Sequence, residues 1–334
     1  MRVLVTGVAG FMGSHLADAL LSNGHEVAGI DNLIGGYRSN VPTNVNFLEA
    51  DLLDLETISP YFQNVDLVLH TACTAYEGLS VFSPALVTSN TSQITATALS
   101  ASIANRVKKF VYMSSMARYG TQANLPFTEG MTPLPQDPYG IAKYASELLV
   151  KNLCETHGMG YSIVVPHNII GPRQKYDDPF RNVASIMTNR MLAGKQPIIY
   201  GDGTQQRCFS FITDVVEPLI KICETNVADS QVINIGPDEE FLTINELAKK
   251  LAEIIGFKLD PIYMPGRPKE VKDANCSADL ARKLLSYKTT TSLDSGLRAL
   301  VDWIRESGTR EFSYHLPIEI VNDQTPKTWT SKLI

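Results

Sequence analysis

A tyrosine and a lysine four positions apart, Tyr139 and Lys143, carry the side chains best suited to proton transfer in this sequence. On a helix, this spacing places both side chains on one face. A lysine ammonium beside a phenol stabilises the phenolate and therefore lowers the tyrosine pKa from its usual value of about 10. The pair could then take the proton of a substrate alcohol. Taken alone, the same spacing also fits an ordinary surface pair.

Three glycines near the N-terminus, Gly7, Gly10 and Gly13, could hold the phosphates of a nucleotide. They follow an apolar segment and precede a helical pattern, so they form a strand-to-helix loop. In such a loop, glycines permit a tight turn, a close approach of the backbone to a pyrophosphate, and close packing of the helix on the strand. The free N–H groups at the start of the helix attract the phosphates. The alternative is a tight turn without a ligand.

Acidic residues after the next two apolar segments indicate the kind of cofactor. Asp31 ends the segment that begins at Glu26, eighteen residues after Gly13. A carboxylate there accepts hydrogen bonds from the adenosine ribose and repels a 2′-phosphate, which favours NAD over NADP. Asp51 ends the third segment and could contact the adenine. The alternative for Asp31 is a residue that only caps a loop.

Six apolar segments in the first half of the chain must position these residues. They are apolar almost throughout, which is typical of parallel strands covered by helices on both faces. Helical patterns lie between them, and this alternation predicts a doubly wound α/β domain of the Rossmann type. The expected strands are Val3–Thr6, Glu26–Asp31, Asn46–Ala50, Asp66–His70, Lys109–Met113 and Tyr161–Pro166, and the expected helices are Ser14–Leu21, Pro84–Ala104 and Tyr139–Thr156.

The alternation breaks after about residue 170, which predicts a second, smaller, mixed α/β domain for the substrate. A strand at Gln231–Gly236 is expected to rejoin the first sheet. The segment from Phe312 to the end has little periodicity, and no function follows from it. We therefore expect a cofactor domain of residues 1–170 and about 208–238, and a substrate domain of residues 171–207 and 239–334.

The 334-residue chain has a net charge of −6, which argues against nucleic acid or an anionic membrane as its main partner. Its five cysteines are an odd number without a C-x-x-C pair, which favours reduced thiols over disulfides or a metal site. No apolar run approaches the roughly 20 residues that cross a bilayer. The sequence begins with a strand pattern rather than a signal peptide. We therefore expect a cytoplasmic enzyme without a bound metal.

Eight motifs spread over nearly the whole chain resemble those of the extended short-chain dehydrogenase/reductase family. The likeness is to its nucleotide-sugar epimerases, of the UDP-glucose/UDP-galactose 4-epimerase type. The motif SSMARYG follows an apolar segment, at the edge of the sheet where α/β proteins bind ligands. The combination is specific for the family and less so for the substrate. The motifs are TGVAGFMGS at 6–14, DNL at 31–33, HTAC at 70–73, SSMARYG at 114–120, YGIAK at 139–143, PHNIIGP at 166–172, YGDGTQQRCFSFITDV at 200–215 and RPKEV at 267–271.

The resemblance implies a catalytic set of Ser115, Tyr139 and Lys143, in which the serine hydrogen-bonds the substrate hydroxyl and the tyrosine is the base. It implies that Asn168, Arg207 and Arg267 bind the substrate diphosphate, for which the planar arginine fork is well suited. It also implies a UDP-linked sugar as substrate, and a homodimer formed through the helices 84–104 and 139–156. The residues expected around NAD are Gly7, Gly10, Phe11, Met12, Gly13, Asp31, Asn32, Asp51, Leu52, His70, Ala72, Asn90, Tyr139, Lys143, Pro166 and Asn168, of which His70 has no expected role in the chemistry.

The residues that follow Ser115 discriminate between the reactions of the family. Dehydratases place acidic residues there to protonate the departing hydroxyl, and decarboxylases carry a Glu at a related position, whereas Met116 and Ala117 can supply no proton. We therefore expect epimerisation at C4. Tyr139 takes the C4 hydroxyl proton while NAD takes the hydride, and the keto sugar turns over before the hydride returns. The alternatives are another nucleotide-sugar epimerase, a 4-keto-sugar reductase or, from another class, a non-catalytic NAD-binding sensor.

Several positions depart from the family pattern and are expected around the sugar. Arg118 replaces a common Val, Cys208 replaces the Asp of an Arg-Asp-Phe triplet, and Glu270 stands where Asp is usual. These departures leave the identity of the sugar open.

Overall fold

Seven parallel strands form the main sheet of the protein, whose computed structural model describes residues 1–334. Their order is β11-β6-β5-β4-β1-β2-β3. The chain therefore winds in one direction from β1 to β3 and in the other from β4 onward, and the order reverses between β1 and β4. Open α/β sheets bind ligands at such a reversal, outside the carboxyl ends of the strands. The strands are β1 (Arg2–Thr6), β2 (Glu26–Asp31), β3 (Asn46–Glu49), β4 (Leu67–His70), β5 (Lys109–Met113), β6 (Gly160–Pro166) and β11 (Val232–Ile235).

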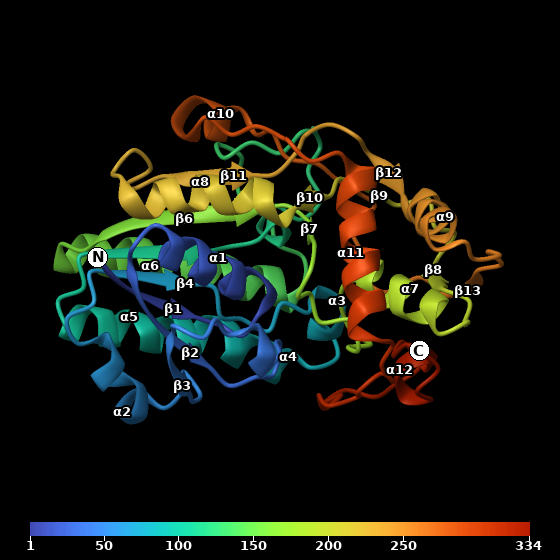
Figure 1. Cartoon of the computed structure of the whole chain (residues 1–334), viewed down its shortest axis with the longest axis horizontal. Coiled ribbons are helices and arrows are strands. Elements are labelled where there is room, and N and C mark those ends of the chain that lie inside the picture. The colour runs from blue at the N-terminus through green and yellow to red at the C-terminus, as the bar shows by residue number, and fades with distance from the viewer.

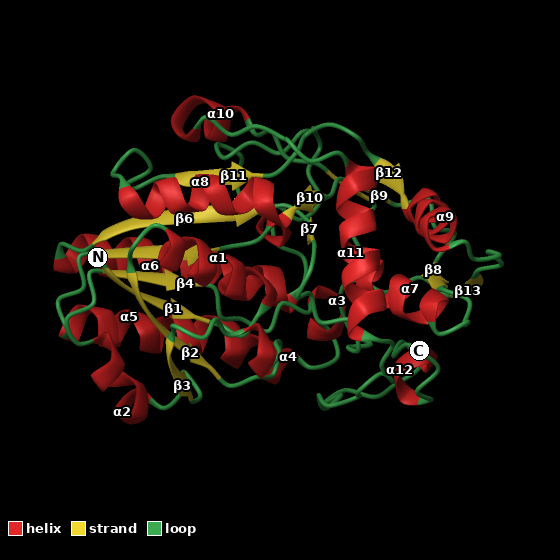
Figure 2. Cartoon of the chain, viewed as in Figure 1, coloured by secondary structure: helices red, strands yellow, loops and turns green.

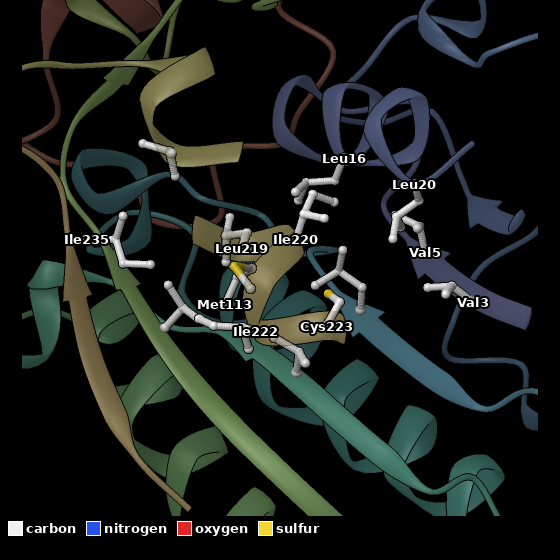
Figure 3. Close-up of a cluster of buried hydrophobic side chains, with 14 of the residues drawn as sticks. Val3, Val5, Leu16, Leu20, Met113, Leu219, Ile220, Ile222, Cys223 and Ile235 are labelled. Carbon is white, nitrogen blue, oxygen red and sulfur yellow. The ribbon is translucent and has the colours of Figure 1, made fainter. Parts of the chain in front are cut away.

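Helices cover both faces of this sheet (Figure 1). On one face, apolar side chains of β1, β5 and β11 pack against the helices α1 and α8, where Val3, Leu16 and Leu219 are fully buried (Figure 3). On the other face, Leu4, Phe110 and their neighbours pack against α5 and α6. The strands therefore bury side chains on both faces, which explains why they are apolar without alternation. The helices are α1 (Phe11–Ser22), α2 (Leu55–Ile58), α5 (Ile94–Ala104), α6 (Pro138–His157) and α8 (Ile212–Glu224).

A smaller lobe is built around three helices and three short sheets (Figure 2). Its core is a cluster of 17 buried residues, contributed mainly by α7, α9 and α11. In Figure 1, α7, α9, β8 and β13 of this lobe lie on the opposite side of α11 from the seven-stranded sheet. The helices are α7 (Val183–Leu192), α9 (Ile244–Ile255) and α11 (Leu293–Ser307), and the sheets pair β7 (Ile169–Ile170) with β10 (Ser210–Phe211), β8 (Ile198–Tyr200) with β13 (Ile262–Met264), and β9 (Gln206–Arg207) with β12 (Leu242–Thr243) and β14 (Asp273–Ala274).

Three differences separate these elements from the sequence-based expectations. The helix expected over 84–104 is divided into α4 (Pro84–Thr88) and α5 by one π-helical turn, in which Asn90 has ψ 19° and leaves the helical conformation. The third strand ends at Glu49, so Asp51 lies in the loop beyond it. The helix α10 (Asp279–Leu285) belongs to the stretch expected in the second domain, yet its apolar residues pack in the core of the first.

Two short helices complete the chain, α3 (Glu77–Ser80) and α12 (Lys327–Thr330). The segment after α11 is mostly loop (Figure 2) and ends beside α7 and α12 (Figure 1). None of the helices combines the length and apolar character that a membrane crossing requires.

Candidate active site

A large cavity opens at the carboxyl edge of the sheet, where the strand order reverses. Its volume is about 1860 Å³ with the open mouth included. Residues of both lobes line it, among them Gly7, Asp31, Arg207 and Val271. Most of the residues expected at the cofactor line it, among them Gly10, Phe11, Met12, Leu52, Ala72, Asn90 and Pro166.

The glycine loop forms one wall of the cavity, and its backbone leaves no room for side chains. Gly7 has φ +75°, and a Cβ there would lie 2.8 Å from the backbone of Ala72. A Cβ on Gly13 would lie 2.2 Å from the carbonyl oxygen of Gly7. The backbone is therefore bare where the helix α1 begins, and its first N–H groups can reach a pyrophosphate. This arrangement fits the phosphates of NAD.

Two carboxylates lie in the cavity beyond the ends of β2 and β3. Asp31 accepts hydrogen bonds from the N–H groups of Ala9 (2.9 Å) and Leu33 (2.7 Å). Burial raises the pKa of Asp31, and these backbone donors oppose the rise. Asp51 accepts a hydrogen bond from the amide of Asn32 at 3.2 Å, and both line the cavity. A fixed carboxylate at Asp31 fits the ribose of NAD and disfavours a 2′-phosphate.

Ser115, Tyr139 and Lys143 all line the same cavity. Tyr139 is the second residue of α6, whose N-cap Asp137 accepts a hydrogen bond from Gly140 N–H at 2.9 Å. The Lys143 ammonium donates to the Met113 carbonyl oxygen at 2.7 Å and lies 5.9 Å from the centre of the Tyr139 ring. The helix α6 therefore brings the tyrosine and the lysine to the carboxyl end of β5.

The direction of the Tyr139 pKa shift corrects the sequence-based argument. Burial raises the pKa of this phenol, and the Lys143 ammonium acts in the opposite direction without outweighing burial. The expected lowering by lysine alone is therefore wrong, because the sequence did not reveal how deeply the ring is buried. A second positive charge in the cavity, such as the ring of NAD+, acts in the same direction as Lys143.

Arg118 lies behind the site and not around the sugar, where the sequence placed it. Its side chain is 4% exposed, and its Nε lies 2.8 Å from Oε1 of Glu147, which is fully buried. The same carboxylate accepts a hydrogen bond from the Ser114 hydroxyl. The ion pair therefore connects α6 to the loop that carries Ser115.

The three residues expected at the substrate diphosphate differ in their position. Asn168 lines the cavity and donates to the Cys208 carbonyl oxygen at 3.1 Å. Arg207 also lines it, and donates to the carbonyl oxygen of Val271 at 2.7 Å. Arg267 does not line it.

The side chain of Arg267 is held behind the cavity by two neighbours. It pairs with Glu270 at 3.0 Å and lies over the Tyr200 ring at 4.8 Å. Glu270 also lies 3.7 Å from Arg207, so this carboxylate connects the two arginines. Arg207 and Asn168 can therefore reach a substrate directly, whereas Arg267 supports Arg207 through Glu270.

The position of His70 corrects its expected place at the cofactor. Its ring is 1% exposed and does not line the cavity. Its nitrogens lie 2.8 Å from the Thr6 hydroxyl and 3.1 Å from the Thr95 hydroxyl. Burial lowers the pKa of His70 to about 3, so the ring is neutral and forms part of the core.

Two charged residues in the cavity escaped the sequence analysis. Glu77 lines the cavity without a hydrogen bond or ion pair from its carboxylate, and burial first, then Asp137, raise its pKa to about 7. More than a third of its surface stays accessible, as expected for a side chain that projects into a cavity. Arg181 also lines the cavity and has no acidic partner; its guanidinium lies 5.6 Å from the centre of the Tyr76 ring.

The sequence offers a signal for Arg181 but none for Glu77. The stretch 171–182 is rich in Pro, Asp and Arg, which is unusual for a loop that merely connects. It also supplies Lys175 and Asn182 to the cavity wall. Glu77 stands alone in a short segment with no motif.

Comparisons with known proteins agree with this geometry. The NAD dependent epimerase/dehydratase family matches residues 3–236. The chain is 31% identical to the putative UDP-glucose 4-epimerase of Methanocaldococcus jannaschii, over 91% of this chain and 99% of the relative.

Two solved structures resemble the protein over almost their whole length. One is the UDP-glucose 4-epimerase of Thermotoga maritima with UDP-glucose, at TM-score 0.87 and 34% identity, which covers 92% of this chain and 99% of the other. The second is the UDP-glucuronic acid 4-epimerase of Bacillus cereus with UDP-glucuronic acid and NAD. It has a TM-score of 0.86 and 30% identity, and covers 92% of this chain and 100% of the other.

Proposed function

The chain belongs to the NAD-dependent epimerase/dehydratase family, and on this premise we propose that it inverts C4 of a UDP-hexose through a transient 4-keto sugar. One observation carries the proposal. Ser115, Tyr139 and Lys143 line the same cavity as the glycine loop and Arg207, and the residues after Ser115, Met116 and Ala117, carry no acid. The site can exchange a hydroxyl proton, but it lacks an acid beside Ser115 to expel that hydroxyl.

The side chains divide the proton chemistry between them. NAD, when bound, supplies a reversible acceptor for the hydride on C4. Tyr139 takes the proton of the C4 hydroxyl and later returns it, while the Ser115 hydroxyl hydrogen-bonds the same oxygen. Lys143, fixed by its bond to Met113, keeps a positive charge beside the phenolate as it forms.

Substrate binding is concentrated on the diphosphate, which leaves the sugar free to turn. Arg207 and Asn168 are the groups that can reach phosphate oxygens from the cavity wall. Under this proposal, residues 1–170 and 208–238 hold NAD, and residues 171–207 and 239–334 hold the nucleotide sugar, with α10 excepted. The two solved relatives bind UDP-glucose and UDP-glucuronic acid, which supports a UDP-linked sugar here.

A panel of three substrates tests the proposal. The protein is incubated separately with UDP-glucose, UDP-N-acetylglucosamine and UDP-glucuronate, and each mixture is analysed for its C4 epimer. We expect conversion of at least one, and its loss in Tyr139→Phe. If none is converted while the protein binds NAD, the proposal is wrong.

We also propose a homodimer that works in the cytoplasm. The helix α6 exposes Ile141 (54%) and Leu148 (49%), and apolar side chains at this spacing suit a partner helix. All five cysteines are free thiols, which suits a reducing compartment. Light scattering of Leu148→Asp tests the dimer, which this change should dissociate. An unchanged mass would contradict an interface on α6.

A further inference from the structure

The C-terminal segment that follows α11, residues 309–334, is attached to both lobes. Glu319 accepts hydrogen bonds from the first N–H groups of α4, those of Ala85 (2.9 Å) and Leu86 (2.8 Å). At its other end, the Thr328 hydroxyl lies 2.5 Å from the Tyr200 hydroxyl of the smaller lobe. The segment therefore holds a fixed position on each of the two lobes.

Its apolar residues build a small core behind the cavity. Trp329 is 2% exposed, and its ring packs edge-on against Phe180 (5.4 Å between centres) and Phe82 (5.9 Å). Tyr76 packs against the same Phe180 at 6.4 Å. The cluster includes Leu316, so three distant stretches of the chain meet in it. Without the C-terminal segment, Phe180 would lose much of its packing.

The other two stretches of this core carry residues of the cavity wall. Arg181 follows Phe180 directly and lies over the ring of Tyr76. The Tyr76 hydroxyl donates to Asp178 at 2.5 Å, and the same carboxylate accepts the Phe180 N–H at 2.9 Å. A displacement of Phe180 would therefore move the guanidinium of Arg181 and loosen the loop beneath it.

Arg181 lies on the part of the wall that faces the reacting end of a substrate. It lines the same cavity as Tyr139, and it lies over the ring of Tyr76, whose neighbour Ala75 packs against the cluster that contains Tyr139. It has no acidic partner in the protein, whereas Arg207 and Arg267 are both associated with Glu270. A guanidinium without a partner is available to oxygens of the bound sugar.

We propose that the C-terminal segment is part of the active site, in which Trp329 positions Phe180 and so holds Arg181 against the sugar of the substrate. Trp329 is a positioning residue and Arg181 a specificity-determining one. This inference rests on the proposed function, because it assigns the sugar end of the cavity by the position of Tyr139.

A double-mutant cycle tests the proposal on the whole protein. Trp329→Ala, Arg181→Gln and the double variant are compared for kcat and KM with each sugar nucleotide that the protein converts, and for the Kd of UDP. We expect each single change to raise KM about tenfold, and the double variant to be no worse than the more affected single variant, because coupled residues are not additive. The Kd of UDP and the content of NAD should stay unchanged, since the proposed function assigns the substrate diphosphate to Arg207 and Asn168.

Two further variants separate positioning from general stability. Trp329→Phe keeps an aromatic ring and should restore KM to near the wild-type value. Val321→Ala, in the same segment but 67% exposed, should leave KM unchanged. An unchanged KM in Trp329→Ala, additive effects, or an equal weakening of UDP would overturn the proposal.

A failure of this proposal can be distinguished from a failure of the proposed function. If the wild-type protein converts no sugar nucleotide, the same variants are compared by calorimetry for binding of UDP-glucose, UDP-N-acetylglucosamine and UDP-glucuronate against UDP. Trp329→Ala must then weaken binding of a UDP-sugar about tenfold and leave UDP unaffected. If Trp329→Ala and the wild-type protein bind the UDP-sugars with equal affinity, the role of Trp329 is refuted, whatever the reaction is.

Discussion

The guanidinium of Arg118 lies 2.8 Å from the carboxylate of Glu147, in a region where both side chains are almost fully buried. The contact is an ion pair and not an aligned hydrogen bond, because Arg118 Nε has no hydrogen-bond partner although it lies close to Glu147 Oε1. Burial raises the pKa of Glu147, and the Arg118 charge opposes this rise. The position of the loop that carries Ser115 thus depends on a buried positive and a buried negative charge that neutralise each other.

Removal of one partner should destabilise the protein strongly. Arg118→Met leaves Glu147 as a buried carboxylate without its charged partner, which costs about 3–5 kcal/mol in the free energy of unfolding. The double variant Arg118→Met/Glu147→Gln should recover most of this loss, since no charge stays buried. Urea unfolding measures both.

An exposed ion pair provides the control. Arg38 and Glu49 are 3.0 Å apart but 62% and 56% exposed, so Arg38→Met should change the free energy of unfolding very little. If Arg118→Met and Arg38→Met lower the free energy of unfolding equally, burial of the Arg118–Glu147 pair has no effect on stability.

The buried ring of His70 should make stability depend on pH in a defined window. Its folded pKa of about 3 lies below the usual value of 6.5, so between these values only the unfolded chain binds the proton. The contribution of His70 to stability is therefore complete above pH 6.5 and declines by about 1.4 kcal/mol per pH unit below it.

Urea unfolding at pH 7, 6 and 5 measures this dependence. The loss between pH 7 and pH 5 should be smaller in His70→Gln than in the wild-type protein. His157→Gln, at an exposed position, should keep the wild-type dependence. If the free energy of unfolding falls equally with pH in His70→Gln and in the wild-type protein, the interpretation of His70 as a buried neutral ring is contradicted.

Glu77 should make substrate binding depend on pH near neutrality. Burial raises its pKa to about 7, so its carboxyl group loses its proton as the pH rises through 7. The new negative charge repels the substrate diphosphate, and KM should rise by at most about tenfold per pH unit, because one group ionises. KM between pH 6 and 9 measures the effect, and Glu77→Gln should flatten the profile. A profile that is the same in both proteins would exclude Glu77 from the substrate end of the cavity.

Asp31 should control the choice of cofactor. Asp31→Asn keeps an oxygen for the loop but loses the charge that binds the ribose and repels a 2′-phosphate. NAD affinity should fall about ten- to hundredfold, since a hydrogen bond to a charged group contributes about 1.5–3 kcal/mol. The preference for NAD over NADP, measured by the Kd of each for the cofactor-free protein, should shrink. Asp54→Asn, in an exposed cap of α2, should leave both values unchanged; the same loss there would remove the role assigned to Asp31.

Local rules made the cofactor loop and the catalytic pair predictable. Gly7 is required by its φ of +75° and Gly13 by the Gly7 carbonyl oxygen in the same strand-to-helix turn, and the spacing of Tyr139 and Lys143 is fixed by one helix. The parallel sheet followed from apolar segments that must be covered on both faces. These features depend on neighbours in the sequence, so a pattern in the sequence reveals them.

Features that depend on distant packing were not predictable. His70 is the last residue of β4, next to the ligand loop, but its ring nitrogens lie against the buried hydroxyls of Thr6 and Thr95. Trp329 has no periodic pattern around it, because its partners Phe82 and Phe180 come from remote parts of the chain. Burial also set the direction of the Tyr139 pKa shift, and no spacing of residues reveals burial.

The most direct test of C4 epimerisation follows the hydrogen on C4. A UDP-sugar from the panel that carries deuterium at C4 is incubated with the protein in ordinary water, and the products are analysed by NMR. The account predicts the C4 epimer with its deuterium retained at C4, and no such product with Tyr139→Phe. Loss of the deuterium to water, inversion at a carbon other than C4, or full activity of Tyr139→Phe would contradict it.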